Sequence, residues 1–444
     1  MTSQEIKIYC PHKNNKRLDY IASQVITGFG GINISITSEK TDFLSYSGPA
    51  INYSKKKLNH GLHIFPQGLL EETGIRPQNI LTIGKWEDFS CFFLQEEGDI
   101  PFDLFAASFY LLSRYEEYIS IRLDEHKRFD PEDSLAYKNN FLDIPLVDRW
   151  AELLKKELLK KYPDIRFFPR KFRFISTFDI DSPYKYRYKS TIRSLGGFAK
   201  DIIQFNFQKI KERIEVLSHF KRDPYMDAIR WIEQWHKAVD KDFYLFILGE
   251  VHGKYGRHTD LPLTAYYQFL RELKLVTLGL HPSYETYENL ELLVREKRNM
   301  EENLSRKIFV SRNHFLRIRL PETFEELSLV GIDEDFSLAY AKINGFRAGT
   351  ALPHFFYSLD QDNVTCLLLH PTIMMDTTFI VHEKILPEEA LKKIKILVDA
   401  CYQSGGDYLS LWHNSNLSGK QEDNPWISVF IESFKYASDL EKNP

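Results

Sequence analysis

The chain has 444 residues, a formal net charge of −4, 43% hydrophobic residues and 27% charged residues. That length exceeds one ordinary hydrophobic core, so two domains are expected. The slight negative charge argues against a general nucleic-acid-binding protein, which needs a basic surplus. The longest apolar runs, such as 243–248, are far too short for a membrane span, and the first residues lack the order of a signal peptide. We therefore expect a cytoplasmic protein; nothing in the sequence indicates its oligomeric state.

The first part of the chain alternates short strands and helices. Residues 5–10 and 32–37 alternate at the strand period, and 102–119 carries apolar residues at helical spacing. A basic amphipathic helix over 150–161 is followed by the breaker Tyr162-Pro163-Asp164, which predicts a boundary. We therefore expect an N-terminal α/β domain over 1–165 and a second domain over 166–444. The first has no glycine-rich phosphate loop and is interpreted as a packing or recognition domain.

Beyond the boundary, apolar runs recur, and several of them end in acids or histidines. The predicted strands are 172–178, 243–248, 275–280, 308–310, 366–369 and 408–412. Helical stretches such as 284–305 and 387–401 lie between them, which predicts a mostly parallel sheet. In a barrel of this kind, catalytic groups lie at the carboxyl ends of the strands. The long, charged, helical insertion over 184–238 is expected to form a lid or a packing surface.

The sharpest chemical signal is Thr177-Phe178-Asp179-Ile180-Asp181, at the end of the first of these strands. Two carboxylates two residues apart can point the same way, because side chains alternate along a strand. One of them can bind a metal ion while the other acts as a base on water. On the residues alone, a strand-terminal acidic turn without chemistry is an alternative.

This motif resembles the first motif of the NodB-type polysaccharide deacetylases, carbohydrate esterase family 4. The later pieces follow in a similar order over roughly 170–430: Gly279-Leu280-His281-Pro282-Ser283, Ser311-Arg312-Asn313-His314, Gly345-Phe346-Arg347-Ala348-Gly349-Thr350 and Leu411-Trp412-His413-Asn414. The resemblance implies a distorted (β/α) barrel, with a separate N-terminal α/β domain as in a bacterial subgroup. It also implies hydrolytic removal of acetyl groups from an N-acetylated carbohydrate.

By this resemblance, Asp179 is the general base and Asp181 binds the metal, with His281 as a second ligand. The family's second metal-binding histidine is missing, because Glu285 stands four residues after His281. Either Glu285 is a ligand or the third ligand comes from elsewhere. We prefer His314, because it follows the neighbouring predicted strand. A set of one oxygen and two nitrogen ligands suits zinc and tolerates cobalt, nickel or iron.

Two further residues complete the expected site. His413 is the candidate general acid toward the leaving amine. Arg347, in a glycine-rich turn, is expected to orient Asp179 or to bind a substrate carboxylate or oxyanion, with a buried salt bridge as the alternative. Two other functions remain open: an inactive relative that binds a carbohydrate or a protein, and a different metal-assisted hydrolase of C–N or ester bonds.

Overall fold

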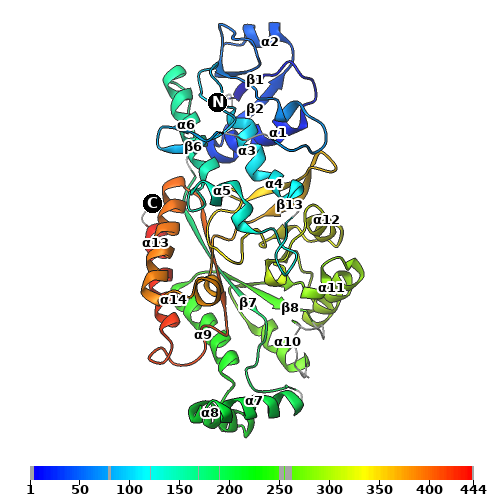
Figure 1. The fold of residues 1–444 in the computed structure, drawn as a ribbon, viewed down its shortest axis with the longest axis vertical. Coiled ribbons are helices and arrows are strands. Elements are labelled where there is room, and N and C mark those ends of the chain that lie inside the picture. Colours follow the sequence, from blue (N-terminus) through cyan, green and yellow to red (C-terminus); the bar gives the residue numbers. More distant parts are fainter. Residues whose placement is uncertain are drawn as a thin grey trace.

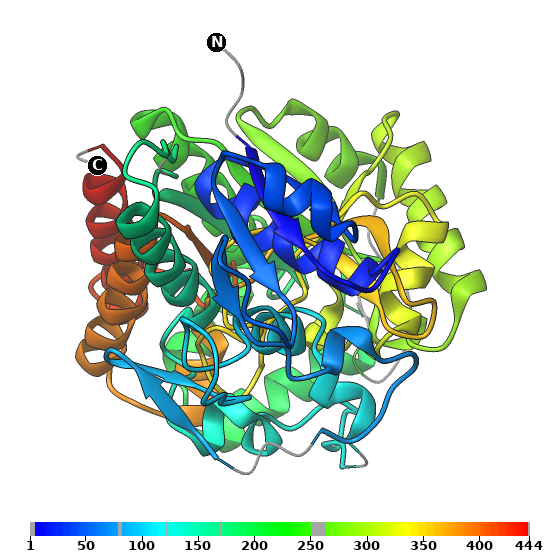
Figure 2. The ribbon, with the colours of Figure 1, turned by 90° about the horizontal axis from the view of Figure 1, so that it is seen from above.

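The structure is a computed structural model, which describes residues 5–78, 82–120, 122–168, 170–189, 191–249, 255 and 263–442. These residues form a mixed α/β structure with a small parallel sheet and a large, mostly parallel one (Figure 1). The small sheet lies at one end of the molecule, and in the view from above it lies across the larger body (Figure 2). No described helix is long and apolar enough to cross a membrane.

The small sheet has the strand order β2-β1-β3-β4, with every pair parallel. Its strands are β1 (Glu5–Tyr9), β2 (Asn33–Thr37), β3 (Ala50–Tyr53) and β4 (Leu62–Ile64), and a separate hairpin is made by β5 (Gly84–Trp86) and β6 (Phe89–Cys91). The helices of this part are α1 (Lys16–Ala22), α2 (Lys40–Ser45), α3 (Leu104–Leu112), α4 (Tyr115–Ile119), α5 (Leu135–Lys138) and α6 (Leu146–Lys161). The expected helix over 102–119 is therefore broken in two. Arg114 adopts a left-handed φ of 56° between α3 and α4 and places its guanidinium beside Glu116 and Glu117.

The large sheet has the strand order β12-β13-β11-β10-β9-β8-β7-β15-β14. Its strands are β7 (Arg173–Ile180), β8 (Phe243–Leu248), β9 (Val276–His281), β10 (Val310–Ser311), β11 (Glu334–Asp335), β12 (His354–Ser358), β13 (Asn363–Leu369), β14 (Met374–Met375) and β15 (Asp407–His413). Only β12 pairs antiparallel among these described strands. The central strands β7, β8 and β9 are buried on both faces toward their carboxyl ends, which accounts for their near-continuous apolar sequence.

Helices connect and cover these strands. They are α7 (Thr191–Ile203), α8 (Phe207–Leu217), α9 (Pro224–Val239), α10 (Leu263–Glu272), α11 (Leu290–Leu304), α12 (Glu322–Leu329), α13 (Pro387–Ser404) and α14 (Pro425–Lys442). Helices α13 and α14 lie side by side along one edge of the molecule in both views (Figures 1 and 2). The insertion expected over 184–238 contains α7, α8 and most of α9, and α7 and α8 lie at the end opposite the small sheet (Figure 1).

The large sheet does not close into a barrel through strand pairing, since no ladder joins its two ends among the described strands. It is nevertheless strongly curved. Seven strand spacings separate β13 from β14 in the order, about 34 Å if the sheet were flat. The chain from Leu369 to Met374 reaches only about 19 Å. Residues 370–373 bridge the gap: Thr372 N donates to Leu338 O on one side, and Ile373 N donates to Leu409 O on the other. We call this bridge the seam.

One continuous hydrophobic core runs through both parts of the chain. At the contact between them, Tyr357 of β12 packs against Tyr20 and Phe109, with ring centroids 5.0 and 5.1 Å away. Arg17 of α1 is buried and forms an ion pair with Asp362 at 2.8 Å. The expected boundary near residue 165 falls in the link between α6 and β7. The division into two domains stays a prediction.

Candidate metal centre

The candidate site residues lie at the carboxyl ends of neighbouring strands. Asp179 and Asp181 are at the end of β7, and His281 is the last residue of β9. His314 begins the short turn His314–Leu316 soon after β10, and His413 is the last residue of β15. These strands are contiguous in the order β10-β9-β8-β7-β15, so their ends meet on one side of the sheet.

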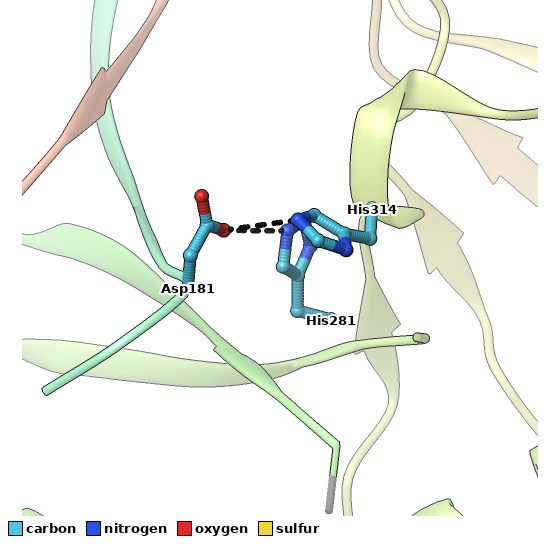
Figure 3. Close-up of side chains that lie close together, drawn as sticks. All are labelled: Asp181, His281 and His314. Carbon is cyan, nitrogen blue, oxygen red and sulfur yellow. Dashed lines mark ion pairs between the residues drawn. The ribbon is translucent and has the colours of Figure 1, made fainter. Parts of the chain in front are cut away.

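The structure brings Asp181, His281 and His314 together. One ligand atom from each lies within 4.8 Å of the others. Asp181 Oδ1 is 3.3 Å from His281 Nε2 and 3.6 Å from His314 Nε2, and the carboxylate faces both rings (Figure 3). Both histidines are buried, whereas the Asp181 side chain is 41% exposed. The group therefore opens to solvent on the side of Asp181.

The second ring nitrogen of His281 has a defined role. His281 Nδ1 lies 2.5 Å from the backbone oxygen of Arg312, which can only accept, so Nδ1 is the protonated nitrogen. His281 Nε2 then faces Asp181 and His314, and it carries the lone pair of the ring when the imidazole is neutral. Neither His281 Nε2 nor Asp181 Oδ1 makes a hydrogen bond to any described residue, although both are buried atoms. The two atoms lie 3.3 Å apart without a hydrogen bond between them, an arrangement that a metal ion between the two side chains would satisfy.

The charges of the group shift its pKa values in different directions. Burial lowers the pKa of His314 to about 4, against the opposing effect of Asp181, so this imidazole is neutral at pH 7. Burial acts against ionisation of Asp181, but His314, His281 and His413 outweigh it and hold the pKa of that carboxyl below its usual range. Burial also opposes the charged form of His281, yet Asp179 and Asp181 raise its pKa.

Glu285, the alternative third ligand, does not join this group. It lies in the turn Tyr284–Thr286, and the described residues that could share a metal ion are Asp181, His281 and His314. The convergence therefore favours His314. Whether these residues bind a metal stays a prediction.

Asp179 is held by an arginine that the sequence analysis did not single out. Arg312 Nη1 donates to Asp179 Oδ1 at 2.9 Å, and both side chains are buried. The guanidinium stacks over Phe246, with 4.5 Å to the ring centroid. The other carboxylate oxygen, Oδ2, is 3.7 Å from His281 Nε2. Arg312 belongs to the motif Ser311-Arg312-Asn313-His314, but 133 residues separate it from Asp179, and no local pattern indicates that pairing.

Arg347 does not contact Asp179, so the expectation that it orients this residue is wrong. Its guanidinium binds both carboxylate oxygens of Glu117, at 2.9 and 2.5 Å, and donates to Ala339 O. Arg114 donates to the same Glu117 carboxylate. Arg347 is therefore part of a buried ion-pair network between α4 and the large-sheet part, the alternative that the sequence left open. The contact with Asp179 belongs to Arg312.

His413 lies next to the carboxylates and is held by Asp376. In the β7–β15 register its backbone is opposite Asp179. His413 Nδ1 lies 2.7 Å from Asp376 Oδ1, and His413 N donates to Asp376 Oδ2 at 2.9 Å. Burial lowers the pKa of His413, but Asp376, with smaller contributions from Asp181 and Asp179, raises it to about 10. The ring is therefore a cation at pH 7, with Nε2 not committed to Asp376.

The N-terminal part of the chain reaches this site. Phe315, next to His314, has a left-handed φ of 62°, a conformation that costs free energy in a residue other than glycine. Its carbonyl oxygen accepts from Arg128 Nη1 at 2.7 Å, and its ring lies 4.9 Å from that of His126. Arg317 Nε donates in turn to His126 O. We call residues 124–128, with their contacts to this turn, the clamp.

Comparisons with known proteins give one family match, in the N-terminal part of the chain, and distant structural likenesses. Residues 6–163 match a family of unknown function, DUF7033. No curated protein matches the chain. Among solved structures, a candidate polysaccharide deacetylase from Mycobacterium smegmatis is similar with a TM-score of 0.39 and 10% identity, over 60% of this chain and 83% of that one. Puue allantoinase is similar with a TM-score of 0.39 and 12% identity, over 61% of this chain and 85% of that one. Such distant likenesses carry no argument about the chemistry, which therefore rests on the site itself.

Proposed function

We propose that the chain is a metal-dependent hydrolase that removes N-acetyl groups from a carbohydrate. The observation that supports this most is the convergence of Asp181, His281 and His314 beside a second carboxylate, Asp179. A cationic imidazole, His413, stands on the next strand. Hydrolysis of an amide needs a base for the water and an acid for the departing amine, and this arrangement offers both.

The three converging residues fit a divalent ion of the zinc type. They present one carboxylate and two imidazoles, a donor set common in catalytic zinc sites, and the same donors suit cobalt, nickel or iron. The Nδ1 bond of His281 to Arg312 O is the kind of outer contact that fixes the tautomer of a ligating histidine. When bound, such an ion polarises a carbonyl group and lowers the pKa of water.

Asp179 is the proposed general base. Arg312 holds one of its oxygens at 2.9 Å, which leaves the other directed toward His281 and the centre of the site. A carboxylate fixed in this way accepts a proton from a water that attacks the amide carbonyl. Arg312 does not reach the substrate in this scheme and acts as a positioning residue for Asp179.

His413 is the proposed general acid. An amine leaves poorly as an anion, so it must receive a proton as the C–N bond breaks. Asp376 keeps His413 protonated at neutral pH and fixes the ring through Nδ1, so Nε2 carries the proton that can be donated. The base and the acid are paired in register on adjacent parallel strands, about 4.8 Å apart at the backbone, so that both can reach one amide group at the carboxyl ends of these strands.

The division of labour between the two aspartates tests the proposal. We expect Asp179→Asn to keep its metal and to lose two to four orders of magnitude of turnover, roughly 3–5 kcal/mol of barrier. We expect the matched variant Asp181→Asn to lose the metal. Elemental analysis and release of acetate from short N-acetylglucosamine oligomers, with zinc, cobalt or nickel supplied, measure both. Loss of metal from Asp179→Asn, or full turnover in it, contradicts the assignment.

The same assay distinguishes the other two functions. A wild-type protein that holds metal but releases no acetate from any N-acetylated sugar overturns the deacetylase and favours a binding module. Turnover of cyclic amides or simple esters, with none of the sugars, assigns a different hydrolysis to the same residues.

A further inference from the structure

The helices α7 and α8 form a hairpin whose apolar side chains face outward. We define the hairpin as residues 191–222. Large hydrophobic side chains that are at least 40% exposed gather there, more densely than elsewhere in the described chain: Ile192, Leu195, Ile202, Ile203, Phe205, Phe207, Ile214, Leu217 and Phe220. A monomeric protein in water rarely keeps so large an apolar surface uncovered, so the hairpin marks an interaction site.

Each helix carries these side chains as one stripe. At 100° per residue, Ile192, Leu195, Ile202 and Ile203 fall within an arc of about 100° on α7. On α8, Phe207, Ile214 and Leu217 fall within an arc of about 80°. Both stripes are therefore amphipathic faces with a regular spacing, and not isolated exposed residues.

The inner side of the hairpin contains a buried ion pair as well as the apolar Val216, which is fully buried. Asp201 of α7 and Arg213 of α8 are buried and form an ion pair, with Nη2 to Oδ2 at 2.6 Å and Nε to Oδ2 at 3.1 Å. Asp201 lies on the side of α7 opposite the apolar stripe. The hairpin thus places its charge pair inside and its apolar stripes outside, an arrangement that favours an apolar medium at its outer surface.

The net charge of the hairpin indicates which kind of apolar surface covers its outer stripes. Residues 191–222 contain seven lysines and arginines against three aspartates and glutamates, a net charge of +4. The whole chain has −4, so the remainder has −8. Exposed basic residues flank the stripes: Lys200, Lys209, Lys211, Lys221 and Arg222. If the hairpin docked on the hairpin of a second copy, two surfaces with a net charge of +4 each would face one another. An anionic lipid surface offers both the opposite charge and an apolar layer.

We infer that the hairpin docks this protein onto an anionic membrane surface, with the apolar stripes at the boundary of headgroups and acyl chains and the lysines among the headgroups. Phe205, Phe207 and Phe220, which are 77%, 72% and 90% exposed, are the side chains that insert. The rest of the chain, with its net charge of −8, is repelled by the same surface. The molecule therefore stands on its hairpin with the small sheet directed away from the membrane (Figure 1). The inference is independent of the hydrolysis proposed above.

Flotation of the full chain with lipid vesicles tests the inference. We expect binding to vesicles of equal parts phosphatidylcholine and phosphatidylglycerol, weaker binding to phosphatidylcholine alone, and a decrease with added salt. The double variant Phe205→Ser/Phe207→Ser is expected to lower the partition coefficient at least about tenfold, because each buried phenylalanine contributes that much or more. Phe168→Ser, at a phenylalanine outside the hairpin that is 69% exposed, is the control and should bind as wild type.

A charge variant separates the electrostatic contribution to vesicle binding from the apolar one. Lys209→Glu/Lys211→Glu should weaken binding to the mixed vesicles and leave the residual binding to phosphatidylcholine unchanged. All the substituted side chains are exposed, and circular dichroism verifies that the variants fold. Wild-type protein that does not float with the mixed vesicles, or a Phe205→Ser/Phe207→Ser variant that floats equally well, overturns the inference. Self-association without vesicles that the same double variant abolishes assigns the hairpin to a second copy instead.

Discussion

His281 uses its two ring nitrogens for different purposes. Nδ1 is committed to the carbonyl oxygen of Arg312, and Nε2 faces Asp181. Arg312 also holds Asp179 through its guanidinium, so one residue positions both a proposed ligand and the proposed base. The backbone and the side chain of Arg312 therefore link the metal group to the acid–base chemistry, and this link explains why a buried arginine stands so close to histidines.

The choice between His314 and Glu285 as third ligand can be measured. We expect His314→Ala to weaken metal binding more than about 100-fold, beyond what the loss of an outer partner produces. Glu285→Gln should change the affinity little, because Glu285 lies outside the converging group. Titration with zinc or cobalt against a competing chelator measures both variants. A large loss confined to Glu285→Gln would reverse the assignment.

The pair of His413 and Asp376 predicts a specific dependence of stability on pH. The ordinary pKa of histidine is about 6.5, and in the folded chain the pKa of His413 is raised to about 10. The pair therefore stabilises the fold fully below about pH 6.5, and this contribution is lost as the pH rises through about 10. Asp376→Asn should lower the free energy of unfolding most at low pH and progressively less toward pH 10.

Urea unfolding across that range measures the effect. Asp333→Asn, at an exposed position, is the control and should give a difference from wild type that does not change in this way. Equal destabilisation by Asp376→Asn at both ends of the range would refute the raised pKa of His413.

The sequence could predict which residue types stand at the strand ends, because the motifs around Asp181, His281 and His314 are local. It could not predict their partners. The pairing of Asp179 with Arg312, or of Arg347 with Glu117, joins segments more than a hundred residues apart. Arg347 illustrates the limit: a glycine-rich turn indicates a special backbone, but only the fold decides which carboxylate the arginine meets.

Among the elements, the strained turn His314–Leu316 connects the two parts of the chain. Arg128 holds Phe315 O and is itself fixed by Asp124 at 2.9 Å, so the clamp keeps the turn in its left-handed conformation. Removing a hydrogen bond from a charged donor costs roughly 1.5–3 kcal/mol, and part of this is expected to appear at the neighbouring His314. The N-terminal part of the chain thereby contributes to the site although it supplies none of the proposed ligands.

We therefore expect Arg128→Ala to lower metal affinity roughly tenfold, about half of that cost, while the fold is retained. Arg122→Ala is the matched control, because Arg122 lies in the same segment, is 62% exposed and makes only long ion pairs of 3.8–4.0 Å. Calorimetric titration with zinc gives the affinities, and thermal unfolding of the metal-free proteins separates a local effect from a general one. Equal affinities in the two variants would show that the clamp does not act on His314.

Periodicity predicted most of the long strands of the large sheet well and the short ones poorly, but it missed β12 and the first three residues of β13. The strands β7, β8, β9 and β15 lie within a residue or two of their predicted ranges. The two-residue strands β10, β11 and β14 are too short to show alternation, and β11 and β14 were not predicted. The break between α3 and α4 was also missed, since apolar spacing continues through Arg114 and the turn is stabilised by ion pairs to Glu116 and Glu117.

At the scale of the whole molecule, the resemblance predicted a barrel, and the structure has a strongly curved open sheet. The difference lies in the seam, where backbone crosses from β13 to β14 without a ladder. Strand alternation cannot reveal closure, because closure depends on how the ends of the sheet meet. A helix-breaking residue such as Pro163 likewise could not predict that the N-terminal part and the large-sheet part share one continuous core.

The position of the seam determines where the large sheet can be distorted without a change in the proposed site. The proposed ligands, base and acid all lie on, or within a few residues of, one unbroken run of paired strands, from β10 through β9, β8, β7 and β15. The seam falls outside that run. Because no ladder crosses the seam, we expect a distortion of the sheet to open there first and to leave the spacing of Asp181, His281, His314 and His413 unchanged. We therefore expect the seam to tolerate a distortion or an inserted residue while the geometry of the proposed site is kept.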